Sequence, residues 1–160
     1  MAAEMTVEAF LPGIAPAAAF ASFADSIGEW WPAETRHIRD ADSRVALLAG
    51  GRFFERATDG RELELGWVRE WHPPERMLLD LYIATGRERP TEVAILFGAV
   101  EGGTRIRIQQ VPKAASAPMW LEFAPRFERA WTRVLKAFCD FSTGAKSQLA
   151  EPAAVVRPQR

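Results

Sequence analysis

One apolar stripe near the end of the chain constrains the fold more than any other feature. Between residues 118 and 144, large apolar side chains recur at steps of three and four, which is the spacing of one face of an α-helix. The stripe consists of Trp120, Phe123, Phe127, Trp131, Val134, Phe138 and Phe141. Pro118 fits the start of such a helix and Gly144 fits its end. A helix of this length must bury its stripe against another layer of the protein.

The residues before this helix supply that layer. From residue 35 to 111, short runs of strand-forming residues alternate with turn signals, which is typical of an antiparallel meander. Residues 5–11 predict one further strand, and residues 16–24 and 25–31 predict two short helices after it. The sequence therefore predicts an α+β protein in which a curved antiparallel sheet of about seven strands wraps around one long C-terminal helix.

Composition indicates a single domain and excludes several classes of partner. Among 160 residues, 20 basic side chains nearly balance 21 acidic ones, so the basic excess of a nucleic-acid-binding protein is missing. No apolar run approaches the roughly 20 residues that span a bilayer, and no signal peptide is visible. One cysteine and two histidines offer no disulfide and no metal site. We expect a cytoplasmic protein with one domain over residues 1–144, a flexible tail over residues 145–160, no metal and no cofactor.

Charge pairing sets the register of a first predicted hairpin. A three-residue loop places Arg56 opposite Glu62 and Glu55 opposite Leu63, so that opposite charges meet. A two-residue loop would set Glu55 against Glu64, and like charges directly opposite each other destabilise a sheet. The three-residue loop is therefore preferred. In this register Phe53 lies opposite Leu65, and one inward face holds Phe53, Glu55, Leu63, Leu65 and Trp67, continuing through Arg69 and Trp71 unless a bulge intervenes.

A second predicted hairpin turns at Gly102 and Gly103. It places Ile106 opposite Ala99, Ile108 opposite Phe97 and Gln110 opposite Ile95. Gln110 is then the polar exception on an apolar face. Met77, Leu79, Leu81 and Ile83 predict a third inward row between the two hairpins.

Several local motifs, taken in order, resemble a known superfamily. They are Ala15-Pro16 with Phe20, Trp30-Trp31-Pro32, Gly50-Gly51-Arg52-Phe53 with Glu55, Gly66-Trp67-Val68, Trp71-His72-Pro73-Pro74-Glu75-Arg76, Thr91-Glu92-Val93, Gly103-Thr104-Arg105-Ile106, and Trp131 with Leu135. Together they resemble the helix-grip superfamily called SRPBCC, which includes START domains and the birch-pollen allergen, and within it the AHSA-like branch. The resemblance covers about residues 4–143. It implies a cavity between the curved sheet and the C-terminal helix, which is large in some relatives and filled in others.

Side chains on the concave face and near its mouth are the candidate ligand-binding residues. They are Trp30, Trp31, Phe53, Glu55, Leu65, Trp67, Arg69, Trp71, Phe97, Gln110, Trp120, Phe127 and Trp131. Their indole N–H groups could orient a ligand, and plain core packing is the alternative. Trp30 and Trp31 are placed at the mouth, because two adjacent residues of a helix cannot both face inward.

Polar candidates each have a structural alternative. Glu55 on an apolar face must find hydrogen-bond donors or take up a proton, so it is either a general acid/base or a structural partner. Arg69 either binds an anionic head group or reaches solvent, and Gln110 either orients a carbonyl group or bonds the backbone. His37 lies near the expected mouth and is interpreted as a surface residue.

The sequence leaves three functions open. The leading hypothesis is binding of a small hydrophobic or aromatic molecule between the sheet and the helix. The second is an enzyme of the cyclase, dehydratase or hydrolase type that uses Glu55 as acid/base. The third is a chaperone-interacting regulator. The regulators that name the branch carry an additional partner-binding domain, whereas only about four residues precede the first expected strand here, so direct chaperone activation is not favoured. A homodimer is compatible with all three.

Overall fold

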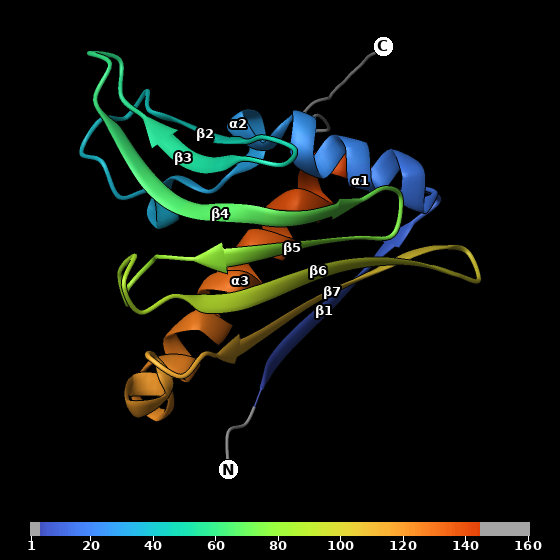
Figure 1. Ribbon diagram of the computed structural model, residues 1–160. Helices are drawn as coiled ribbons and strands as arrows, with labels where there is room; N and C mark the ends of the chain where they lie inside the picture. Colours follow the sequence, from blue (N-terminus) through green and yellow to red (C-terminus); the bar gives the residue numbers. More distant parts are fainter. Residues whose placement is uncertain (1–3, 145–160) are drawn as a thin grey trace.

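The computed structural model describes residues 4–144, and the predicted tail at 145–160 lies outside the described residues (Figure 1). In chain order the elements are β1 (Met5–Pro12), α1 (Pro16–Asp25), α2 (Ile27–Trp30), the 3-10 turn η1 (Ala33–Thr35), β2 (Arg44–Leu47), β3 (Arg52–Arg56), β4 (Glu62–His72), β5 (Arg76–Leu81), β6 (Thr91–Val100), β7 (Gly103–Pro112), the 3-10 turn η2 (Ala117–Met119) and α3 (Trp120–Thr143).

The strands form one antiparallel sheet in the order β1-β7-β6-β5-β4-β3-β2. β2 to β7 follow one another as a meander. β1 pairs with β7 and is the edge strand on that side of the sheet. Figure 1 shows this sheet curled around α3, with α1 and α2 near the end formed by β2 and β3. The predicted α+β fold, a seven-stranded sheet wrapped around a C-terminal helix, is confirmed.

α3 buries the stripe that its sequence predicts. The buried residues of this helix are Trp120, Phe127, Trp131, Val134, Leu135 and Phe138. The Phe138 ring lies 5.2 Å from that of Phe23 in α1 and 5.0 Å from that of Trp30 in α2, measured between ring centroids. The helix ends at Gly144, whose φ of 71° suits glycine. The opposite face of α3 is charged, and no helix between residues 4 and 144 has the length and apolar character to span a membrane.

The first hairpin has the predicted pairs next to its turn and a bulge farther along the strands. Arg56 lies opposite Glu62 and Glu55 opposite Leu63, as the charge argument requires. Between Phe53 and Phe54 the register shifts, so Phe53 lies opposite Gly66 rather than Leu65. The predicted position of Phe53 is therefore wrong by one residue.

This bulge reverses the side on which the rest of β4 presents its side chains. Leu65 is buried on the concave side, but Trp67 is 44% exposed, and Val68 is buried in its place. The prediction that Trp67 faces inward is wrong. Leu63 is 41% exposed, although it keeps its predicted partner.

Arg69 follows the reversed alternation to the outer side, and a second register shift between Val68 and Glu70 brings Trp71 back to the inner side, as predicted. Arg69 has no partner in the β4–β5 register and is exposed on the outer side. Trp71, beyond the shift, points inward again, with its ring edge-on to that of Phe20 at 5.1 Å. The first bulge therefore turns Trp67 and Arg69 outward, and the second leaves Trp71 facing the core.

The second hairpin keeps its predicted faces with a different turn. Gly103 pairs with Val100, so the turn is formed by Glu101 and Gly102. Ile106 lies opposite Phe97, Ile108 opposite Ile95 and Gln110 opposite Val93. The predicted partners are thus wrong by two residues. A shift of two leaves every side chain on its original face, so the predicted inward row with Gln110 in it is confirmed.

Candidate functional site

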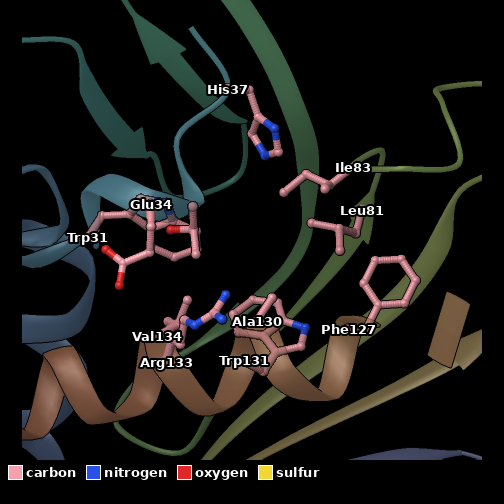
Figure 2. A pocket seen from close by; sticks show the side chains of 11 residues that line it. Trp31, Glu34, His37, Leu81, Ile83, Phe127, Ala130, Trp131, Arg133 and Val134 are labelled. Atoms are coloured by element: carbon pink, nitrogen blue, oxygen red, sulfur yellow. The ribbon is translucent and has the colours of Figure 1, made fainter. Parts of the chain in front are cut away.

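A pocket of about 210 Å³ opens between α3, the end of β5 and the segment that follows α2 (Figure 2). Its apolar wall consists of Trp31, Leu81, Ile83, Phe127, Ala130, Trp131 and Val134. Its polar rim consists of Glu34, Thr35, His37 and Arg133. Glu34, His37 and Arg133 are exposed to solvent, so the pocket is apolar inside and charged at its mouth.

Regular secondary structure fixes most of the apolar wall. Phe127, Ala130, Trp131 and Val134 are three or four residues apart on α3 and therefore share one face of the helix. Leu81 is the last residue of β5 and is 1% exposed. Because these residues also pack the core, the shape of the wall does not depend on a mobile loop.

A buried hydrogen-bond chain holds Trp131 in place. The Trp131 indole Nε1–H donates to the Gln110 Oε1 at 2.8 Å, and the Gln110 Nε2 donates to the Thr91 hydroxyl at 2.9 Å. Gln110 and Thr91 are both fully buried. The Gln110 side chain thus bonds two side chains and fixes one wall of the pocket, whereas the sequence left open a ligand carbonyl or the backbone as its partner.

Replacing Gln110 by leucine is expected to lower the free energy of unfolding by about 2 kcal/mol, because it leaves the Trp131 N–H and the Thr91 hydroxyl buried without their partner. Chemical denaturation measures this. Gln109→Leu is the matched control, since Gln109 is half-exposed on the other face of β7, and a change within about 0.5 kcal/mol is expected there. Equal losses of unfolding free energy at both positions would contradict the stabilising role of these buried hydrogen bonds.

Both tryptophans of the Trp-Trp pair are buried, each 5% exposed, so the prediction that only one faces inward is wrong. Trp30 is the last residue of α2, and Trp31 has left the helix with an extended backbone (φ −60°, ψ 126°). Trp30 packs into the core against Phe23 and Phe138. Trp31 lines the pocket, with its ring perpendicular to that of Trp131 at 6.2 Å. Within residues 4–144, neither Trp30 Nε1 nor Trp31 Nε1 has a hydrogen-bond partner.

Glu55 ties the segment that carries the polar rim to the sheet. Its carboxylate is fully buried and accepts hydrogen bonds from the backbone N–H of His37 at 2.8 Å, the backbone N–H of Ile38 at 3.1 Å and the Ser43 hydroxyl at 2.7 Å. Arg36 strengthens the same segment by donating to the carbonyl oxygens of Ser43 and Trp31. Three donors satisfy the carboxylate, and Glu55 does not line the pocket. Its geometry is that of a structural clamp.

The rim carries two kinds of charge that are not paired with the rest of the protein. Among the described residues, no ion pair within 4 Å includes the Glu34 carboxylate, the His37 imidazole or the Arg133 guanidinium. In Figure 2 the Arg133 guanidinium and the His37 imidazole reach toward the mouth from opposite sides. These groups are available to a ligand.

The structure gathers only part of the predicted ligand-binding set around the pocket. Trp31, Phe127 and Trp131 line it, and Gln110 supports Trp131 from behind. The remaining inward residues lie in or against the core: Trp30, Phe53, Leu65, Trp71, Phe97 and Trp120. The Trp120 ring stacks on that of Phe127 at 6.0 Å and so supports the wall indirectly.

The two outward residues belong to a different surface. Arg69 lies 3.5 Å from both Asp80 and Glu92, and Lys113 lies 2.5 Å from Asp80. This network covers the convex side of the sheet beside Trp67, which is opposite Asp80 in the register. Trp67 and Arg69 are therefore remote from the pocket.

Sequence reasoning missed the residues that complete the pocket. Leu81 and Ile83 belonged to the predicted inward row and Val134 to the helical stripe, so their position near a cavity could have been inferred. Ala130 lies three residues after Phe127, and Arg133 lies two residues after Trp131, on the flank of that stripe. Glu34, Thr35 and His37 belong to a segment without periodicity, so only His37 was placed near the mouth.

Cys139 is a free cysteine that lies partly buried on α3. Burial, together with the neighbouring Asp140, raises the pKa of the Cys139 thiol above its usual value, which lowers its thiolate fraction at neutral pH. Between residues 4 and 144, no group of three or more His, Cys, Asp or Glu side chains could hold a metal ion.

Sheet, helix and pocket together define a helix-grip domain with a small apolar cavity beside its long helix. The family model described as "Activator of Hsp90 ATPase homolog 1-like protein" matches residues 15–141, and the chain therefore belongs to this family. The resemblance to the AHSA-like branch of the SRPBCC superfamily is confirmed. No curated protein matches the chain in sequence.

Solved structures of similar proteins agree on the fold. An AHSA1-like protein from Aeromonas hydrophila has 22% identity and a TM-score of 0.61, with 94% of this chain and 98% of that chain covered. A protein from Nitrosomonas europaea has 16% identity and a TM-score of 0.62, with 90% and 96% covered. A protein from Mesorhizobium loti has 14% identity and a TM-score of 0.60, with 89% and 98% covered. At these identities the likeness establishes the fold alone.

Proposed function

We propose that this protein binds a small apolar molecule with one or two rings in the pocket beside α3. The supporting observation is a hollow of about 210 Å³ whose interior is lined by seven apolar residues. In another protein, an engineered apolar cavity of about 150 Å³ binds benzene. The pocket therefore has room for a substituted ring or two fused rings. Sites for drug-sized ligands typically measure roughly 300–1,000 Å³, so a long lipid chain is too large.

The wall is suited to a flat ligand because its aromatic side chains are held rigidly. Trp131 is fixed by Gln110, and Trp31 is packed edge-on against Phe53 at 5.7 Å. Aromatic rings gain from stacked and edge-on contacts beyond the burial of apolar area. A rigid wall also avoids the loss of side-chain freedom that weakens binding.

Filling the pocket tests this function. Ala130→Phe adds a ring inside the pocket and is expected to weaken binding of the neutral naphthalene dye prodan at least tenfold, measured from the blue shift of the dye's emission. Ala124→Phe is the control, because Ala124 is also partly buried on α3 but does not line the pocket. Prodan binding that is unchanged in Ala130→Phe, or equally weakened in both folded variants, would contradict the proposal. Melting curves of both variants establish that they are folded.

The other two hypotheses draw less support from the geometry. An acid/base role for Glu55 requires a carboxylate that reaches a ligand, whereas this one is enclosed by three donors away from the pocket. The family description names an activator of a chaperone ATPase, but the pocket supports a small ligand rather than a protein partner. The chaperone role, the cytoplasmic location and the homodimer stay predictions.

A further inference from the structure

We infer that the ligand of this pocket carries a carboxylate, which Arg133 holds at the mouth while the ring lies against the apolar wall. The inference rests on the proposed function and adds the ligand's charge and orientation to it. Three observations support it: the position of Arg133 at the pocket mouth, the absence of an ion pair for its guanidinium among the described residues, and the nature of the other rim residues.

Arg133 lies where it can hold the polar end of a bound ring. It follows Ala130 by three residues on α3 and precedes Val134, so its side chain leaves the helix at the edge of the apolar wall. Figure 2 shows its guanidinium directed toward the space beside Trp131. A planar guanidinium matches a carboxylate with two parallel N–H donors, which makes arginine well suited to this role.

The guanidinium has no anionic partner in the described part of the protein. Two other cations of α3 do pair with an acid one turn away: Arg126 lies 3.6 Å from Glu122 and Lys136 lies 2.9 Å from Asp140. Among the ion pairs of residues 4–144, none within 4 Å includes Arg133. A cation at the mouth of an apolar pocket, without an internal partner, favours a ligand of opposite charge.

His37 and Glu34 define how much negative charge the mouth accepts. The His37 imidazole approaches from the side opposite Arg133 and offers a second N–H donor (Figure 2). The Glu34 carboxylate opposes an anion, and in Figure 2 it lies near Trp31, away from Ile83 and Phe127. Two donor groups, Arg133 and His37, against the single Glu34 carboxylate suit a ligand with one negative charge. A cationic ligand would be repelled by the Arg133 guanidinium.

Three naphthalene derivatives of similar size separate charge from ring binding: 2-naphthoate (anion), 2-naphthamide (neutral) and 2-naphthylmethylammonium (cation). Calorimetric titration of the full chain is expected to rank their affinities in that order. Arg133→Gln is expected to weaken 2-naphthoate about tenfold and to leave 2-naphthamide within about twofold. Glu34→Gln is expected to strengthen 2-naphthoate about twofold to threefold.

Arg129→Gln is the matched control, because Arg129 is exposed one turn earlier on α3 and does not line the pocket. It should leave all three affinities unchanged. Failure of 2-naphthamide and 2-naphthoate alike to bind would overturn the proposed function. If 2-naphthamide binds as tightly as 2-naphthoate, or if Arg129→Gln weakens the anion as much as Arg133→Gln does, the carboxylate inference fails and the proposed function stands.

Discussion

Replacing Glu55 by alanine is expected to lower the free energy of unfolding by about 3 kcal/mol. The change leaves the backbone N–H groups of His37 and Ile38 and the Ser43 hydroxyl without their acceptor, and each of these was satisfied by one carboxylate. For a chain of this size, such a loss corresponds to a melting temperature roughly 6–12 °C lower. Calorimetric or circular dichroism melting measures it.

Two further variants make this result specific. Glu128→Ala removes a carboxylate from the exposed side of α3 and should change stability by less than about 0.5 kcal/mol. Glu55→Gln keeps the size of the side chain but turns one acceptor into a donor, so we expect an intermediate loss. An acid/base residue would instead tolerate this amide replacement in the fold. If Glu55→Gln is as stable as the parent protein, the clamp is not what Glu55 provides.

Gly66→Ala is expected to destabilise the protein by a similar amount, about 3 kcal/mol. A Cβ atom at this position would lie 2.4 Å from the backbone oxygen of Asp80 and 3.4 Å from the Phe53 ring. Both neighbours are held in the sheet, since Gly66 pairs with Phe53 on one side and with Leu81 on the other. The added methyl group must therefore force the strands apart at the bulge.

Gly98 provides the matched control for this substitution. It also lies within a strand, β6, but a Cβ atom there would meet no heavy atom within 4 Å. Gly98→Ala is expected to leave stability unchanged or raise it by about 0.5 kcal/mol, because alanine loses less conformational freedom on folding. Denaturant unfolding compares the two variants. Similar stabilities would show that the sheet absorbs the extra methyl group at Gly66 without strain.

The sequence predicted the parts of the fold that follow from periodicity. The stripe on α3 and the inward rows of β5, β6 and β7 are apolar at regular intervals, so their burial follows from spacing alone. The charge argument at the first hairpin placed Glu55 on the concave side, and it is fully buried there. The predicted register of the second hairpin was wrong by two residues, but the predicted inward face was still correct because side chains in a strand repeat their orientation every two residues.

The errors arose where one residue interrupts the repeat. The first register shift in β4 turns Trp67 and Arg69 to the convex side and the second returns Trp71 to the concave side, and the apolar and polar residues of the strand do not mark either position. Gly66 is the only local signal, since a glycine inside a strand often accompanies a bulge or a close approach of two backbones. A large apolar side chain such as Trp67 also biases any prediction toward the core, although it is 44% exposed here.

The polar rim could not be predicted because its residues are brought to the pocket by tertiary contacts. Glu34 lies within the 3-10 turn η1 and His37 lies two residues after its end, in a stretch whose sequence shows no repeat. Their place beside α3 depends on Glu55, which is 18 residues away from His37 in the chain and bonds only the backbone there. The periodicity of a sequence predicts which side chains are buried. It does not predict which distant strand will hydrogen-bond a loop.

Glu55 holds the rim segment by its backbone, so the residues that determine ligand selectivity differ from those that stabilise the fold. The clamp recognises N–H groups that every residue except proline possesses, so the side chains at positions 34 and 37 can be exchanged without disturbing it. Arg133 is exposed at the edge of the apolar wall and is equally replaceable. Evolution or protein engineering could thus alter which molecules this hollow accepts by changing three exposed positions, while the aromatic interior stays as it is.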